Sequence, residues 1–149
     1  MSDAFKCIAL IAHDHRKAAL LKWAEVHARE LEKYRLVATG TTGRLIQNRT
    51  GLEVEALESG PLGGDLEVGA MIARGDIDLL VFFWDPLESQ PHDPDIRALL
   101  RIAVVWNVPV ACNESTADFL MHSRCLDNGY RREIPDYSAY RGRPGLPEN

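Results

Sequence analysis

The sequence predicts an α/β fold in which a mostly parallel sheet carries helices on both faces. Short apolar runs alternate along the chain with segments whose apolar residues recur at helical spacing. Such alternation is typical of a doubly wound sheet. The length of 149 residues suits one domain with a full hydrophobic core, and no linker or repeat divides it. We therefore expect a single domain over 1–149, with an irregular tail from about residue 135 that is rich in Pro, Gly, Tyr and Arg.

Strands and helices alternate through the first half of the chain. The run KCIALIA is apolar throughout, which is typical of a strand buried on both faces. Leu20, Trp23 and Leu31 then recur at helical spacing. LEVEALE alternates between apolar and polar residues, as a more exposed strand does. The expected elements are a strand at 6–12, a helix at about 15–32, a strand at 34–39, a helix at about 42–49 and a strand at 52–58.

The same alternation continues through the second half. A helix is expected to begin at Asp65 and to end before Gly75, a common residue after a helix. DLLVFFW is the most apolar run and is expected to be the central strand. The remaining elements are expected at 78–84 (strand), 91–107 (helix), 108–112 (strand) and 115–121 (helix). The buried stripe of helix 91–107 is predicted to be Ile96, Leu99, Leu100, Ala103 and Val104.

Composition excludes several classes of function. The formal net charge is −5 and no basic cluster stands out, so no nucleic-acid partner is expected. No apolar run approaches the roughly 20 residues of a membrane helix, and no secretory leader is expected. The cysteines Cys7, Cys112 and Cys125 form no CxxC pair, which favours free thiols in a cytoplasmic protein.

The unusual polar clusters all follow predicted strands. They are HDHRK (13–17), TGTTG (39–43), SGPLGGD (59–65), DPLESQPHDPD (85–95) and NEST (113–116). Because the carboxyl ends of parallel strands meet at one edge of the sheet, these clusters should lie together there. The pattern indicates a ligand site at that edge rather than a plain structural role.

TGTTG suits a phosphate group. Gly40 lets the backbone approach closely, and Thr39, Thr41 and Thr42 offer hydroxyl donors before a helix N-terminus. It is neither a Walker motif nor a dinucleotide fingerprint, and an N-cap with a tight turn explains it equally well. Lys17 either adds the positive charge that a phosphate needs or is a solvated helix lysine.

The histidines and carboxylates of the loops suggest chemistry. HDH lacks a further close ligand pattern, so no metal site is expected, and Asp14 either caps the following helix or serves a site. His92 stands between prolines that stiffen its loop, which favours a functional imidazole. Asp93 and Asp95 precede a helix, where capping explains at least one of them.

Taken together, AHDHRK, ATGTTG, SGPLGGD, FFWDP, PHDPD and VWNVPVACN resemble the methylglyoxal synthase family. The resemblance runs from about residue 6 to 137, with the motifs in the family's order. It implies a lyase that converts dihydroxyacetone phosphate to methylglyoxal and inorganic phosphate, with phosphate as product and inhibitor. It also implies that no metal or organic cofactor is needed and that the subunits form a homohexamer.

The resemblance also implies roles for particular residues. Asp65 matches the family's catalytic base and His92 its catalytic histidine. Further active-site acids are Asp14, Asp85 and Asp95. The matched substrate and phosphate contacts are His13, Lys17, Thr39, Gly40, Thr41, Thr42, Ser59 and Gly60. The family adds a C-terminal arginine from a neighbouring subunit, for which Arg141 and Arg143 are both candidates.

These residues define a hypothesis of mechanism. Asp65, made more basic by burial, would remove a proton next to the substrate carbonyl to give an enediolate. His92 would polarise that carbonyl, with Asp85 or Asp95 orienting the ring through its other nitrogen. Two alternatives remain open, namely a module of the same fold that binds a phosphorylated metabolite without turnover, and a phosphosugar isomerase.

Overall fold

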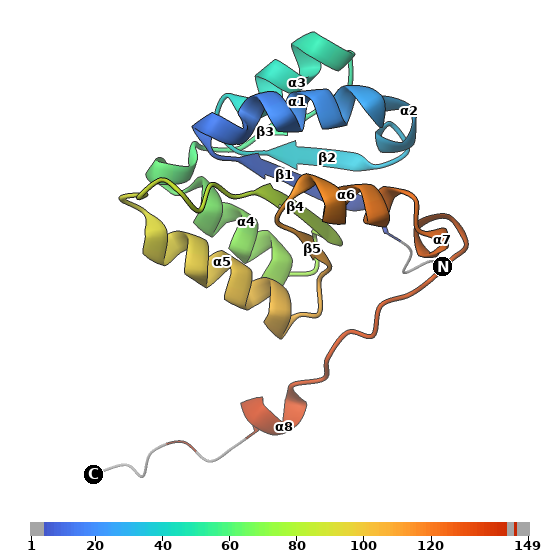
Figure 1. Cartoon of the computed structure of the whole chain (residues 1–149). Coiled ribbons are helices and arrows are strands. Elements are labelled where there is room, and N and C mark those ends of the chain that lie inside the picture. The colour runs from blue at the N-terminus through green and yellow to red at the C-terminus, as the bar shows by residue number, and fades with distance from the viewer. Residues whose placement is uncertain (1–4, 143–144, 146–149) are drawn as a thin grey trace.

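The structure, a computed structural model, describes residues 5–142 and residue 145. Its centre is one parallel sheet with the strand order β3-β2-β1-β4-β5 (Figure 1). The strands are β1 (Cys7–Ala12), β2 (Arg35–Ala38), β3 (Glu55–Ala56), β4 (Leu79–Phe83) and β5 (Val110–Ala111). The prediction of a parallel α/β sheet is confirmed.

Helices cover both faces of the sheet and give it two cores (Figure 1). One core joins Ile8 and Leu10 of β1 to the helices α1, α3 and α6. The other joins Ala9 and Ile11, which point the opposite way, to α4 and α5. The main helices are α1 (Lys17–Val26), α3 (Thr42–Thr50), α4 (Gly64–Ala73), α5 (Asp93–Val105) and α6 (Glu114–Met121). Shorter turns of helix are η1 (Asp14–Arg16), α2 (Ala28–Leu31), η2 (Gly60–Leu62), α7 (Arg124–Asp127) and α8 (Ser138–Arg141).

The strand order reverses beside β1. The chain builds β1, β2 and β3 in one direction and then crosses to place β4 and β5 on the other side. In such sheets the crevice for ligands opens at the carboxyl ends of the strands that flank the reversal. His13 follows β1 there, and its backbone N–H extends the ladder to Phe83 O of β4 at 3.2 Å.

The structure corrects several sequence predictions. β1, not the more apolar β4, is the central strand. Both strands are buried along their whole length, so the apolar character of a strand does not show which one lies in the middle. The strand expected at 52–58 shrinks to Glu55–Ala56. Val104 is 78% exposed, because it faces away from the α4 side of α5. The helix expected at 15–32 breaks at His27, whose Nε2 lies 3.1 Å from Asp118 Oδ1.

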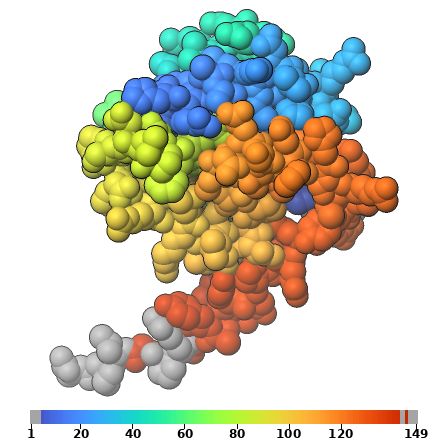
Figure 2. Space-filling model, in the orientation of Figure 1, coloured from blue at the N-terminus to red at the C-terminus, as the bar shows by residue number. Residues whose placement is uncertain are grey.

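The tail runs away from the sheet and ends its described course at α8 (Figure 1). Figure 2 shows α8 in red at the edge of the molecule, where Tyr137 and Arg141 contact Trp106 after α5. The tail is therefore not wholly irregular, as the sequence had suggested. Within residues 5–142, no helix is long and apolar enough to cross a membrane.

Candidate active site

A cavity of about 290 Å³ lies at the carboxyl ends of β1 and β2, at the predicted edge of the sheet. Its wall contains every predicted site residue except Asp85 and Asp95. The predicted residues in the wall are His13, Asp14, Lys17, Thr39, Gly40, Thr41, Thr42, Ser59, Gly60, Asp65 and His92. Four of the five predicted polar clusters thus meet in one place, whereas no residue of the fifth, NEST (113–116), lines the cavity.

A larger hollow of about 620 Å³ lies elsewhere, around the start of β2 and residues 51–55. Its wall holds apolar residues, three glutamates, Arg35 and Gln47, but no histidine. The smaller cavity combines two imidazoles, a buried carboxylate and a lysine, which makes it the candidate active site.

Glycines shape the loop that brings Asp65 into the cavity. Gly63 has φ 106°, a backbone conformation that favours glycine. A Cβ on Gly64 would lie 2.0 Å from the carbonyl oxygen of Glu58, so only glycine lets the helix start pass that close. A Cβ on Gly60 would lie 3.2 Å from His92 Nε2 and 3.4 Å from both oxygens of Asp65. Gly60 therefore keeps the space beside the carboxylate and the imidazole open.

Asp65 and His92 form a buried pair. Asp65 is 1% exposed in the first turn of α4, and its Oδ2 lies 3.4 Å from His92 Nε2. Oδ2 is buried without a hydrogen-bond partner among the described residues. Burial raises the pKa of the Asp65 carboxyl, the nearby His92 opposes the rise, and the charge of Asp95 adds to it. The result is an unusually basic carboxylate with one oxygen left for a ligand.

His13 is held in one tautomer. The backbone N–H of Asp85 donates to His13 Nδ1 at 3.0 Å, so in the neutral ring the proton is on Nε2. Nε2 is buried and has no partner within the part of the chain that the structure describes. Burial, followed by the proximity of His92, lowers the pKa of His13. The ring lies edge-on to His92, with 5.9 Å between the ring centroids, and it forms part of the cavity wall. His13 can therefore donate a hydrogen bond from a neutral Nε2–H to a ligand in the cavity.

The side chains of Asp85 and Asp95 do not orient His92. Asp85 accepts from the backbone N–H of Leu87 and lies 3.3 Å from His15 Nδ1. Asp95 acts on Asp65 only through its charge. His92 Nδ1 is buried with no hydrogen bond to any described residue. The expectation that either carboxylate orients this ring is not met, and the part that Asp85 plays is to fix His13 through its main chain.

The opposite end of the cavity carries Lys17 and the threonines. Lys17 Nζ lies 2.9 Å from Asp14 Oδ1 and donates to Thr41 Oγ1 at 3.2 Å. The hydrogen bond and charge of Lys17 lower the pKa of Asp14. Thr41 is the N-cap of α3, yet its side chain makes no capping hydrogen bond. The N-cap alternative for TGTTG is therefore weakened, and Lys17 is held toward the cavity rather than left in solvent.

Thr39 and Thr42 are buried, and Gly40 has φ 54° with Ser59 close behind it. Asp14 caps no helix, because it is the first residue of η1 and His13 occupies the N-cap position.

Sequence reasoning missed Gln90, which also lines the cavity. Its position two residues before His92 was the available signal. Among the described residues, no group of three His, Cys, Asp or Glu side chains is arranged to hold a metal ion.

Comparison with known proteins connects this geometry to one family. The sequence model of the MGS-like domain matches residues 19–112. Proteins named methylglyoxal synthase from Erwinia tasmaniensis and Coxiella burnetii are each 58% identical over 93% of this chain, which covers 91% and 96% of their lengths. The crystal structure of methylglyoxal synthase from Elizabethkingia anophelis has a TM-score of 0.89 at 50% identity, covering 100% of this chain and 97% of the other.

The close approach at Gly64 makes a prediction about stability. Gly64→Ala should lower the free energy of unfolding by about 2–3 kcal/mol, because the backbone at Glu58 must shift. The control, Gly51→Ala, places a Cβ in open space at φ 76°, and about 1 kcal/mol is expected from its left-handed conformation alone. Urea unfolding of both variants measures the difference. Equal losses would contradict the proposed close contact.

The raised pKa of Asp65 makes a prediction about pH. The folded protein favours the protonated acid, so its charged form destabilises the fold at neutral pH. Asp65→Asn should therefore be more stable than the natural chain at pH 7, by on the order of 1 kcal/mol. The advantage should shrink as the pH falls through the raised pKa toward the ordinary value of 3.8. Denaturant unfolding at several pH values tests this, and a variant that is less stable at pH 7 would contradict it.

Proposed function

Because the chain belongs to the methylglyoxal synthase family, we propose that its cavity converts dihydroxyacetone phosphate into methylglyoxal and inorganic phosphate. The chain is an enzyme that acts on a small phosphorylated molecule. The observation that carries the specific proposal is the buried Asp65–His92 pair, which shares one cavity with Lys17 and the threonines. One end of the cavity suits proton transfer, and the other suits a phosphate.

Asp65 acts as the base. Its free oxygen removes a proton from the carbon that bears the substrate hydroxyl, and the electrons of that C–H bond form the enediolate. A carboxylate in water has a pKa near 4 and is a poor base, so the burial that raises the pKa of Asp65 increases its strength. Gly60 leaves room for the reacting carbon beside the carboxylate.

Two imidazoles stabilise the negative charge that develops on the substrate oxygens. His92 polarises the carbonyl and moves protons between the enediolate oxygens. His13, whose ring lies edge-on to His92 in the same cavity, offers its neutral Nε2–H. A neutral imidazole suits this task because it donates a hydrogen bond without holding the enediolate as an ion pair.

Phosphate leaves in the next step. The electrons of the enediolate expel it as the carbon–oxygen bond breaks. The remaining enol then takes up a proton at its methylene carbon and loses its hydroxyl proton, which gives methylglyoxal. Departure requires that bond to stand out of the enediolate plane, whereas an isomerase holds it in the plane. We assign this geometry to Lys17 and residues 39–42, which also stabilise the leaving dianion. A crystal structure with an enediolate analogue whose phosphate lies in the plane would contradict the assignment.

The subunit alone provides little positive charge for this dianion. Lys17 is the one lysine or arginine in the wall of the described cavity, and Asp14 already pairs with it. We propose that the enzyme is a homohexamer in which a tail arginine of a neighbouring subunit completes the phosphate site. Arg141 lies over Trp106 of its own chain, and Arg143 lies outside the described residues.

Exposed leucines near the cavity are consistent with such packing. Leu62 is 73% exposed in η2, and Leu66 is 51% exposed at the start of α4. We also place the enzyme in the cytoplasm, because its three cysteines are free thiols, as expected in a reducing compartment.

The activity can be tested directly. The purified protein, given dihydroxyacetone phosphate and no added metal, should release methylglyoxal and phosphate in equal amounts. Asp65→Asn should lower kcat by about 100-fold or more, as loss of a general base does. Asp76→Asn, which changes an exposed carboxylate outside the cavity, is the matched control.

The products also separate the alternatives. An isomerase would consume the substrate without releasing phosphate, and a sensor module would bind it without turnover. Either result would contradict the proposed lyase.

Phosphate should inhibit by occupying the same end of the cavity. Lys17→Met should weaken that inhibition about tenfold or more, because it removes a charged hydrogen-bond donor. Lys22→Met, at an exposed position of α1, should leave inhibition unchanged. Phosphate titration of the initial rate gives the inhibition constant, and a flat titration curve for the natural protein would refute this site.

A further inference from the structure

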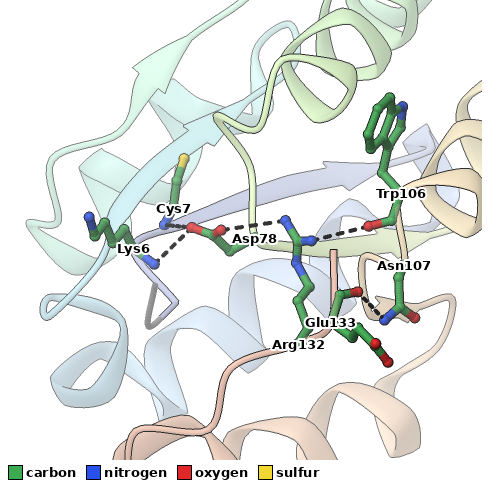
Figure 3. A network of polar contacts seen from close by, with 7 residues as sticks. All are labelled: Lys6, Cys7, Asp78, Trp106, Asn107, Arg132 and Glu133. Carbon is green, nitrogen blue, oxygen red and sulfur yellow. Dashed lines mark hydrogen bonds and ion pairs between the residues drawn. The ribbon is translucent and has the colours of Figure 1, made fainter. Parts of the chain in front are cut away.

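A second polar network lies at the opposite end of the sheet from the cavity, around Arg132 of the tail (Figure 3). The Arg132 side chain is only 7% exposed. One of its nitrogens donates to the carbonyl oxygen of Trp106 at 3.1 Å, and another lies 3.7 Å from Asp78 Oδ1. The guanidinium group therefore joins the tail both to the end of α5 and to the start of β4.

Asp78 extends this network to the start of β1. Its Oδ2 accepts the backbone N–H groups of Lys6 at 2.9 Å and Cys7 at 3.1 Å. Asn107, the residue after Trp106, has φ 56° and donates through Nδ2 to the carbonyl oxygen of Glu133 at 2.8 Å. Residues 132–133 of the tail are thus fixed to the body by the side chain of Arg132 itself and by those of Asp78, just before β4, and Asn107, just after α5 (Figure 3).

Further contacts continue along the tail. The Tyr137 hydroxyl donates to the carbonyl oxygen of Val105, and its ring packs edge-on against Trp106 at 5.2 Å. The Arg141 guanidinium lies over the same indole at 5.8 Å. The tail therefore follows the end of α5 up to α8, and none of its described residues lines the cavity of its own subunit.

We propose that Arg132 is a positioning residue that fixes the direction in which the tail leaves the subunit, and so where the tail can reach a neighbouring active site. The proposal rests on the proposed function, in which the cavity needs a cation from outside its own chain. A free tail would lose much conformational freedom on reaching a neighbour, whereas a tail held at its base loses less.

The chemistry of Arg132 fits an orienting role better than a packing role. An apolar side chain would fill the same space without the cost of burying a charge. A guanidinium group instead presents donors in a rigid plane, so it fixes an angle between its partners. Here those partners are Trp106 O, at the C-cap of α5, and Asp78 Oδ1, in the loop before β4.

The test uses mixed oligomers. Arg132→Met subunits keep Asp65 but should have a misdirected tail, whereas Asp65→Asn subunits lack the base but keep a normal tail. The two are coexpressed with different affinity tags and purified over both. Arg124→Met, which changes an exposed arginine before the tail, is the matched control. Circular dichroism and solution mass check that each variant is folded and assembled.

Arg132→Met alone is expected to lose about 100-fold in kcat/KM, since a shift of about 1 Å in a catalytic contact has that effect. Phosphate inhibition should weaken in parallel. Mixing with Asp65→Asn should restore activity to about a quarter of the natural level, because half of the subunits keep the base and half of those meet a normal tail.

A second variant tests the partner of Arg132. Asp78→Asn retains an oxygen for the backbone N–H groups of Lys6 and Cys7 but loses the ion pair with Arg132, so it should reproduce the Arg132→Met defect.

Normal activity of Arg132→Met would overturn the proposal. A loss of activity that mixing does not restore would also overturn it, since that defect would lie within the subunit itself.

A chain ending at residue 134 separates this proposal from the one it rests on. If that chain keeps full activity, the neighbouring tail plays no part and both the tail contribution and the Arg132 proposal fail, while the lyase reaction stands. If the natural protein releases no methylglyoxal, the proposed function itself fails.

Discussion

The site depends on a carboxylate buried next to an imidazole with nothing between them. Asp65 is 1% exposed and has an oxygen without a partner among the described residues, a costly arrangement for a charged group. The loop before it is built around that arrangement. Gly64 lets the helix begin close to Glu58, and Gly60 leaves space where any other residue would crowd His92 and Asp65. Burying the acid costs stability and also raises its basicity, which is what the proposed role of Asp65 requires.

The topology of the sheet brings the remaining groups to this carboxylate. The reversal of strand order between β1 and β4 opens a crevice, and His13 and Asp85 follow those two strands. The main chain at Asp85 fixes the tautomer of His13 across 72 residues of sequence. The proposed base and the two imidazoles are thus held by rigid elements, while the proposed phosphate end of the cavity uses the loop before α3 and Lys17 of α1.

Much of this was predictable because the signals are local. Continuous apolar runs identified β1 and β4, and the glycines before Asp65 identified the loop that carries it. What could not be predicted depends on contacts distant in sequence. The Asp85 N–H that fixes His13 is one such contact, and the exposure of Val104 on α5 depends on which helices pack beside it. The network around Arg132 was missed for the same reason, since Asp78 lies 54 residues away.

We have proposed that burial makes Asp65 a stronger base than an ordinary aspartate and that Asp65 removes the substrate proton. The most direct measurement is the acid limb of the pH profile of kcat/KM, which reports the essential base of the free enzyme. We expect a single acid limb with a midpoint clearly above the ordinary aspartate value of about 4. A midpoint at or below that value, or the same limb retained by the residual activity of Asp65→Asn, would contradict it.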